Sequence, residues 1–199
     1  MSQEEERPLE NIDARDLVSA TADRRHDRLT SYPSAGPHNS LWHWTKTVKR
    51  RKVYRNYILM RLARGCPSLS LKNWLYRRMG MKVGQHVSIG LEASVDIFFP
   101  ELITIEDEVI VGFGATIISH EYMQREYRTG PVVIGRGAIL GTKSFVMPGV
   151  TIAPGTVVSA MSLVNRDVEG FVGGVPARPL KSARRSEAEA PARQARRSP

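Results

Sequence analysis

Apolar residues recur at a spacing of six between positions 83 and 164. Neither a strand nor a helix has this period, because side chains repeat every two residues on a strand and every 3.6 on a helix. A six-residue repeat is typical of a parallel β-helix, in which short strands alternate with tight corners and the coils stack. The twelve aliphatic residues on this spacing are Val83, Ile89, Val95, Ile105, Val111, Ile117, Ile134, Leu140, Val146, Ile152, Val158 and Val164.

The residues between these lead positions fit the same structure. We expect each lead residue to point inward and stack on its equivalent in the next coil. The residue four places later is small or short, which suits a narrow corner, and the glycines that follow five of the leads would adopt backbone angles that other residues avoid. Three units make a coil of about eighteen residues, so the pattern predicts about four coils around one apolar column. A sandwich of short strands would restart its alternation every 8–12 residues instead.

The repeat pauses twice, from Val95 to Ile105 and from Ile117 to Ile134. The longer pause predicts a loop that leaves a rigid scaffold, which is a common place for function. His120 lies at the root of this loop, so the scaffold can hold its imidazole in place. Neutral imidazole can accept a proton from a hydroxyl group near pH 7.

The sequences PVVIGRGAILG after the loop and FVGGVPARPLK near the end resemble the hexapeptide-repeat acyltransferase family, over about residues 80–181. The likeness is to the maltose, galactoside and xenobiotic O-acetyltransferase branches. It implies a mainly β fold, a left-handed parallel β-helix of about four coils. General sterics favour right-handed crossovers, so the handedness rests on the resemblance alone. The family also implies a homotrimer with sites shared between subunits, acetyl-CoA as acyl donor, and no metal.

The resemblance further implies roles for individual residues. His120 would be the general base of an O-acyltransferase that moves acetyl from acetyl-CoA to a hydroxyl of a sugar or glycan precursor. Asp96 would bind an acceptor hydroxyl or orient His120 from a neighbouring subunit. The other residues implied to bind the acceptor are Tyr122, Glu126 and Arg128. Those implied to bind the CoA moiety are Gly141, Thr142, Ser159, Ala160, Asn165, Arg166, Arg178 and Lys181. The chain departs from the sugar branches at Glu121, where those branches usually have proline, which leaves the acceptor open.

Charge is unevenly distributed along the chain. The net charge is +9, residues 1–27 hold eight of the twenty acidic residues, and residues 28–91 hold none but thirteen Lys or Arg. We expect residues 1–39 to be a disordered acidic tail and residues 182–199 a disordered C-terminal tail, because both lack large apolar clusters. Between them we expect a basic helical segment over 40–79 and the acyltransferase domain over 80–181.

The basic segment predicts one long amphipathic helix over 41–64, with Tyr54, Ile58 and Leu62 on its apolar stripe, and a short helix over about 71–79. One interpretation is that these helices close the end of the β-helix and contact a neighbouring subunit. The alternative is a peripheral contact with an anionic membrane through Trp42, Trp44 and the cluster 46–55.

Composition excludes several other functions. The single cysteine, Cys66, rules out an internal disulfide and suits the cytoplasm. No recognised nucleic-acid motif accompanies the positive charge, so we expect no nucleic acid as partner. Carbonic anhydrase, another activity of this scaffold, needs three histidines on zinc, and only His86 and His120 lie within the repeats. A non-catalytic membrane-surface or assembly scaffold built on a β-helix remains the alternative function.

Overall fold

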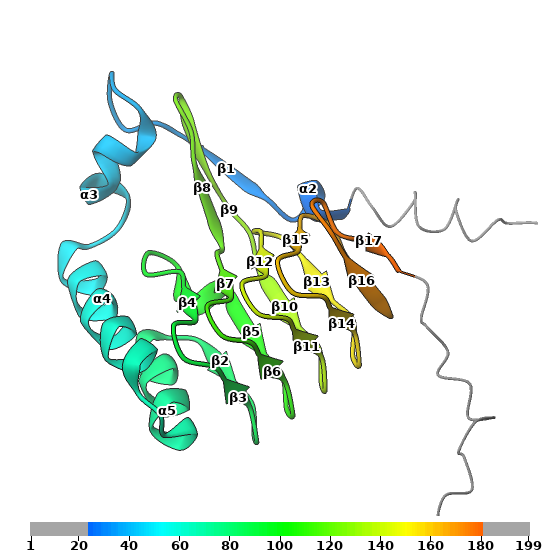
Figure 1. Ribbon diagram of the computed structural model, residues 1–199. Coiled ribbons are helices and arrows are strands. Elements are labelled where there is room, and N and C mark those ends of the chain that lie inside the picture. Colours follow the sequence, from blue (N-terminus) through cyan, green and yellow to red (C-terminus); the bar gives the residue numbers. More distant parts are fainter. Residues whose placement is uncertain (1–23, 181–199) are drawn as a thin grey trace, which may run out of the picture.

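The protein is a three-sided prism of stacked coils with helices at one end (Figure 1). The computed structural model describes residues 24–180. Each coil adds one short strand to each of three sheets, and the strands within a sheet are parallel except at the C-terminal end. The observed class is therefore mainly β, as the sequence predicted. The left-handed winding stays a prediction that rests on the family resemblance.

We number the sheets in the order in which the chain visits them. Sheet I contains β2 (Lys82–Val83), β5 (Ile103–Ile105), β10 (Val132–Ile134) and β13 (Thr151–Ile152). Sheet II contains β3 (Ser88–Ile89), β6 (Ile110–Val111), β11 (Ile139–Leu140), β14 (Val157–Val158), β16 (Phe171–Gly173) and β17 (Arg178–Pro179). Sheet III contains β4 (Ser94–Val95), β7 (Thr116–Ile117), β12 (Phe145–Val146) and β15 (Leu163–Val164).

The lead residues form three columns inside the prism. In sheet I, Val83 pairs with Ile105, Ile105 with Ile134, and Ile134 with Ile152, and the other two sheets repeat this register. All twelve side chains are buried, and so are the residues four places after ten of them; the exceptions, Phe99 and Glu121, lie in the two pauses of the repeat. Burial of this column is the main apolar contribution to stability, at about 25 cal/mol per Å² removed from water.

The glycines that follow the lead residues have a different role from the one the sequence suggested. A Cβ at Gly141 would lie 2.4 Å from the backbone nitrogen of Ala160, so glycine here allows neighbouring coils to approach closely. The left-handed backbone occurs instead three places after the lead residue. Non-glycine residues, His86 among them, adopt it there as well as glycines such as Gly137. Close approach, and not a special φ, explains the glycines next to the leads.

The helical segment is broken where one helix was expected. Residues 40–47 form the short turns η1 (Ser40–His43) and α3 (Trp44–Thr47), and α4 runs over Arg50–Gly65. The break falls at Val48, which is buried and extended (φ −134°, ψ 140°). The short helix, α5 (Leu69–Met79), begins two residues before its predicted start. None of the helices within residues 24–180 is long and apolar enough to span a membrane.

Residues 24–39, expected to belong to a disordered tail, have defined structure. They form α2 (Arg24–Asp27) and β1 (Thr30–Pro33), and β1 pairs antiparallel with β9 (Glu126–Thr129). The segment has no apolar periodicity, because backbone pairing and the Arg25 guanidinium, which donates to the Pro148 carbonyl, hold it in place. Residues 1–23 and the predicted tail over 182–199 lie outside the described residues.

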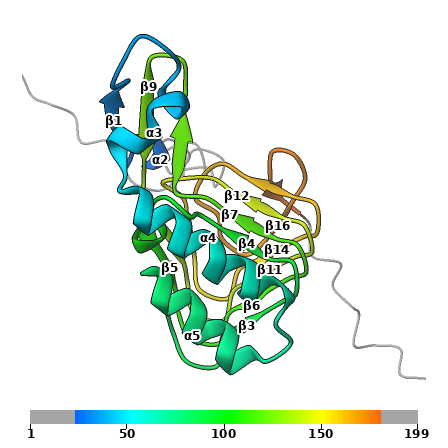
Figure 2. The ribbon, with the colours of Figure 1, turned by 90° about the vertical axis from the view of Figure 1, so that its left-hand side faces the viewer.

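Side chains of α5 cover the edge of the first coil. An uncovered sheet edge leaves backbone carbonyl groups without partners and exposes them to pairing with other chains. Here α5 packs against that edge (Figure 2). Its polar side chains donate to the free carbonyls. The donors and acceptors are Lys72 to Ile89 and Gly90, Asn73 to Val87, Tyr76 to Ala93, and Arg77 to Val83 and Gly84.

Tyr76→Phe tests this capping. Tyr76 is fully buried, and its hydroxyl donates to the Ala93 carbonyl at 3.1 Å. Because an unsatisfied buried polar group costs about 1–3 kcal/mol, we expect the free energy of unfolding in urea to fall by about that amount. Tyr57→Phe removes a hydroxyl from a half-exposed side chain of α4 and should change it by less than about 0.5 kcal/mol. Equal effects of the two variants would show that the Tyr76 hydroxyl does not support the edge.

Candidate active site

Both pauses in the repeat fall at the same corner of the prism, where the chain passes from sheet III to sheet I. The first follows β4 and the second follows β7, and β4 and β7 are paired neighbours. The second pause is a hairpin rather than a loop, made of β8 (His120–Tyr122) and β9. Stacking therefore brings residues of the first pause under the root of the hairpin.

Asp96 is buried beneath this root and its carboxylate is fully hydrogen-bonded. Oδ1 accepts from the backbone nitrogens of Phe98 (2.7 Å) and Phe99 (3.0 Å). Oδ2 accepts from the Ser119 backbone nitrogen (2.9 Å), lies 2.9 Å from the Ser119 hydroxyl oxygen, and is hydrogen-bonded to Nδ1 of His120. Asp96 is thus hydrogen-bonded to His120 of its own chain, whereas the resemblance implied either that it binds an acceptor hydroxyl or that it orients His120 from a neighbouring subunit.

The carboxylate of Asp96 is held in its ionised form. Burial alone would raise its pKa, but the hydrogen bond and charge of His120, together with the Phe99 and Ser119 backbone donors, bring the pKa below its ordinary value of 3.8. An ionised carboxylate only accepts hydrogen bonds, so Nδ1 of His120 must carry the proton. In the neutral ring, Nε2 then has a free lone pair, and no hydrogen bond to Nε2 occurs within residues 24–180.

Aromatic rings surround the imidazole. The ring centroids of Phe98, Phe99 and Tyr122 lie 5.0, 5.9 and 4.9 Å from that of His120. Tyr127 lies behind them, 5.6 Å from Tyr122. The His120 side chain is 16% exposed, so the ring reaches the surface from an apolar collar.

The short helix α3 completes this collar. The Trp44 ring meets that of Phe98 edge-on at 5.8 Å, and the Thr47 hydroxyl lies 3.2 Å from the Tyr122 hydroxyl. Burial raises the pKa of Tyr122, so its phenol stays protonated and can donate a hydrogen bond at neutral pH. The break at Val48 allows α3 to turn toward His120, which the predicted single helix would not have done.

Two of the predicted acceptor contacts face away from the imidazole. Side chains on a strand alternate between faces, and the register pairs His120 with Thr129 and Tyr122 with Tyr127. Glu126 and Arg128 thus lie on the opposite face of the hairpin, where they form an ion pair with each other. Tyr122 and Asp96 are the members of the predicted set that the structure brings to His120.

The N-terminal segment braces the hairpin along its β9 edge. β1 forms its third strand, and the buried Arg25 makes an ion pair with Glu121, the residue after His120. Nearer the tip, the Ser40 hydroxyl donates to the Met123 carbonyl at 2.7 Å and accepts from its backbone nitrogen. These contacts fix the hairpin at both ends. None of these contacts was predicted from the sequence.

The predicted CoA contacts lie at two corners. Gly141, Thr142, Ser159 and Ala160 stack where the chain passes from sheet II to sheet III, and the Gly141 backbone nitrogen donates to the Val158 carbonyl at 2.8 Å. Asn165 and Arg166 follow β15, at the corner of His120. Asn165 Oδ1 and Arg166 Nε are among the six buried side-chain atoms without a hydrogen-bond partner in the described part of the chain. Arg178 is exposed on β17, and Lys181 lies outside the described residues.

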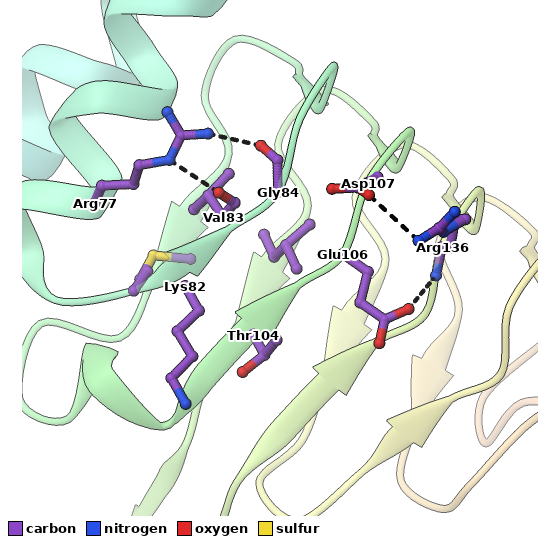
Figure 3. Close-up of a pocket in the computed structure, with 10 residues that line it drawn as sticks. Arg77, Lys82, Val83, Gly84, Thr104, Glu106, Asp107 and Arg136 are labelled. Atoms are coloured by element: carbon purple, nitrogen blue, oxygen red, sulfur yellow. Dashed lines mark hydrogen bonds and ion pairs between the residues drawn. The ribbon is translucent and has the colours of Figure 1, made fainter.

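A separate hollow of about 630 Å³ opens at the remaining corner, between sheets I and II (Figure 3). Its charged groups serve the fold. Arg77 donates to the Val83 and Gly84 carbonyls, the Arg136 backbone nitrogen donates to Glu106 at 2.8 Å, and the Arg136 guanidinium lies 3.4 Å from Asp107. We therefore place the candidate site at His120 and not in this hollow. Within residues 24–180 no three His, Cys, Asp or Glu side chains are grouped to hold a metal ion.

Sequence reasoning missed most of the collar: Phe98, Phe99, Tyr127, Trp44 and Thr47. A usable signal was present, because both pauses follow a lead residue of the same column, Val95 and Ile117. Residues after those leads must stack, which places the two phenylalanines of the first pause near the histidine of the second. The contribution of Trp44 had no such signal, since it depends on the break at Val48.

Comparisons with known proteins agree with this fold. No family model matches the chain. The Bacillus subtilis (strain 168) protein named "Putative acetyltransferase YvoF" is 45% identical over 158 residues, covering 78% of this chain and 90% of that protein. A Staphylococcus aureus (strain MRSA252) protein of the same description, SAR0816, is 37% identical over 141 residues, covering 69% and 88%.

Solved structures show the same fold. The hexapeptide-repeat acetyltransferase VCA0836 of Vibrio cholerae, complexed with acetyl coenzyme A, has a TM-score of 0.53 at 22% identity, covering 64% of this chain and 85% of that one. Galactoside acetyltransferase in complex with coenzyme A has a TM-score of 0.54 at 18% identity, covering 84% and 90%. The chain belongs to the hexapeptide-repeat acetyltransferase family, as its sequence had indicated.

The ionised state of Asp96 predicts how stability depends on pH. Because its pKa is lower in the folded chain than in the unfolded chain, the stability it supplies is fully present above its ordinary value of 3.8 and is lost as pH falls through the folded pKa. We expect the free energy of unfolding, from urea titrations, to fall more steeply below about pH 4 for the wild type than for Asp96→Asn. Asp27→Asn, at an exposed position of α2, should retain the wild-type slope. If the free energies of unfolding of wild type and Asp96→Asn fell with the same slope below about pH 4, Asp96 would not be ionised in the folded chain as described.

Proposed function

We propose that the protein transfers the acetyl group of acetyl-CoA to a hydroxyl group of a sugar or glycan precursor in the cytoplasm, where the single Cys66 would stay reduced. The observation that carries this proposal is the pair of Asp96 and His120 at the root of the hairpin. Membership of the family supports acetyl-CoA as donor, since VCA0836 and galactoside acetyltransferase have been solved with acetyl coenzyme A and coenzyme A.

The pair would act as a general base. Nε2 of His120 takes the proton of the acceptor hydroxyl while the oxygen attacks the thioester carbonyl. The tetrahedral intermediate then collapses, the carbon–sulfur bond breaks, and the CoA sulfur receives the proton from Nε2. Asp96 holds the ring orientation and stabilises the imidazolium that forms between these steps, a role that suits its buried, ionised carboxylate.

The aromatic collar favours a sugar as the acceptor. One face of a sugar ring is largely C–H and packs on an aromatic ring, while its hydroxyls need polar partners. Phe98 and Tyr122 offer the rings, and the Tyr122 phenol, bound to Thr47, offers a hydroxyl partner beside the imidazole. Such an acceptor would present one hydroxyl to Nε2 while its apolar face stays on the collar.

The acyl donor would lie in a cleft between two adjacent β-helices of a homotrimer. Gly141, Thr142, Ser159 and Ala160 lie at one corner and His120 at another, with sheet III between them. A groove between neighbouring prisms can bring one chain's late-coil corner to the next chain's histidine. The buried, unpartnered Asn165 Oδ1 and Arg166 Nε support a polar ligand beside the last coil.

His120→Ala tests the base. With acetyl-CoA and a panel of sugar and glycan acceptors, we expect kcat to fall by about 10²- to 10⁴-fold with little loss of fold. The control is His86→Asn, since His86 is an exposed corner residue with a left-handed φ that asparagine tolerates.

Saturating acetyl-CoA at about 100 times Kd should add roughly 2.7 kcal/mol to the stability of both variants. Full activity of His120→Ala would refute the base. Absence of any acetyl-CoA stabilisation in the wild type would favour the non-catalytic scaffold.

Mixed trimers test the shared cleft. Thr142 is exposed on a single prism, so Thr142→Trp should fill the cleft without disturbing the core, and His120→Ala should remove the base. If each site takes His120 from one subunit and the donor groove from the next, unfolding and reassembling the two inactive variants together should create sites with neither defect. We expect activity to return in the mixture and not in either variant treated alone. A mixture that stays inactive, with mixed assembly shown by mass spectrometry, would place both functions in one chain.

A further inference from the structure

The apolar stripe of α4 faces solvent. Tyr54, Ile58 and Leu62 follow one another at i, i+4 spacing and are 61%, 58% and 58% exposed. The buried side of α4 consists instead of Val53, Asn56 and Ala63. The stripe that the sequence identified is therefore free of contacts with the prism, and its three large side chains need another explanation.

Helix α5 extends the same apolar surface. Its outward residues Leu69, Leu71 and Trp74 are about half-exposed, while Lys72, Leu75 and Tyr76 are buried against the first coil. The two helices pack against each other and lie side by side on the outside of the prism (Figure 2). We call this surface the helical face and define it as Tyr54, Ile58, Leu62, Leu69, Leu71 and Trp74.

Unpaired arginines accompany the helical face. Among the described residues, Arg50, Arg51 and Arg61 of α4 and Arg78 of α5 are exposed with no carboxylate in ion-pair range, and the Arg78 guanidinium lies 5.5 Å from the Trp74 ring. The nearby acids are already engaged, since Glu101 pairs with Lys52 and Glu92 with Arg64. A partner that fits this face must therefore offer both an apolar layer and negative charge.

We propose that the helical face binds the surface of an anionic phospholipid bilayer. Isoleucine and leucine enter the boundary between headgroups and acyl chains, tyrosine and tryptophan lie at headgroup level, and the arginines pair with lipid phosphates. A two-fold contact with a second copy is a poorer fit, because it would place this face against itself and bring the arginines of the two copies together. The surface differs from the one expected from sequence, since Trp44 packs on Phe98 and Lys52 pairs with Glu101.

This docking would bring the imidazole close to the membrane. A series of aromatic contacts leads from the helical face to the site: Tyr54 meets Trp44 at 6.4 Å, Trp44 meets Phe98 at 5.8 Å, and Phe98 meets His120 at 5.0 Å. The acceptor class that fits is a glycan carried on a lipid, with the lipid in the bilayer and the sugar at the collar. This assignment of the acceptor rests on the proposed function, whereas the docking itself does not.

Vesicle flotation with the full chain tests the docking. The probes are vesicles of phosphatidylcholine alone and of phosphatidylcholine mixed with phosphatidylglycerol. We expect binding to the mixed vesicles only, weakened by added salt. The double variant Ile58→Ser/Leu62→Ser should bind at least about tenfold more weakly. The matched control is Ile110→Ser, which removes a similarly exposed isoleucine from β6 and should bind as the wild type does.

The outcomes separate docking from catalysis. Wild-type protein that ignores the mixed vesicles, or a double variant that binds them fully, would overturn the proposal. The proposal would also be overturned if light scattering showed fewer subunits in the double variant than in the wild type and the wild type did not bind vesicles. The face would then be an interface between copies. If the double variant keeps its transfer to a soluble sugar but loses transfer to a glycolipid in vesicles, both the docking and the acceptor class are supported. Loss of transfer to the soluble sugar together with full vesicle binding would count against the docking role.

Discussion

Hydrogen bonding from coil to coil is the constraint on which the rest of the structure depends. Each coil satisfies its backbone only through the coil above and the coil below, as in the donation from Gly141 to Val158. Close approach demands glycine where the corner begins, since a Cβ at position 141 would meet the next backbone at 2.4 Å. The first coil has no coil below it, so α5 must supply donors such as Lys72 and Tyr76. The position of the helices, and with it the helical face, follows from this requirement.

The same constraint determines where chemistry can be placed. A strand cannot be lengthened without breaking the register, so an excursion is possible only at a corner, and the two excursions leave from one corner in successive coils. Asp96 then comes from the lower excursion and His120 from the upper one, and their contact is as rigid as the stack itself. A pair positioned in this way needs little reorganisation when charge develops on the ring, which is the condition under which electrostatic stabilisation is strongest.

The sequence predicted the prism and the histidine because both depend on local pattern. A period of six marks the coils, and a pause in that period marks the position of His120. The sequence could not predict the hairpin brace, because β1 is held by backbone pairing and by Arg25, which carry no periodic signal. It misjudged the long helix for a related reason, since the break at Val48 is set by tertiary contact between α3 and the collar. The face of the hairpin on which Glu126 and Arg128 lie depends on the strand register, and the sequence alone does not supply that register.

The surroundings of the imidazole and the helical face are parts of one surface. Rings that exclude water around His120 strengthen its interaction with the Asp96 carboxylate, because electrostatic attraction grows as the local dielectric falls. The same rings leave an apolar opening, and apolar surface next to a site persists only where a ligand covers it. Trp44 connects that opening to Tyr54 on α4, so aromatic contacts run without a gap from the outer helix to the ring beside His120. An acceptor with a polar sugar and an apolar anchor would cover both parts at once, whereas a small soluble sugar would leave the outer part exposed.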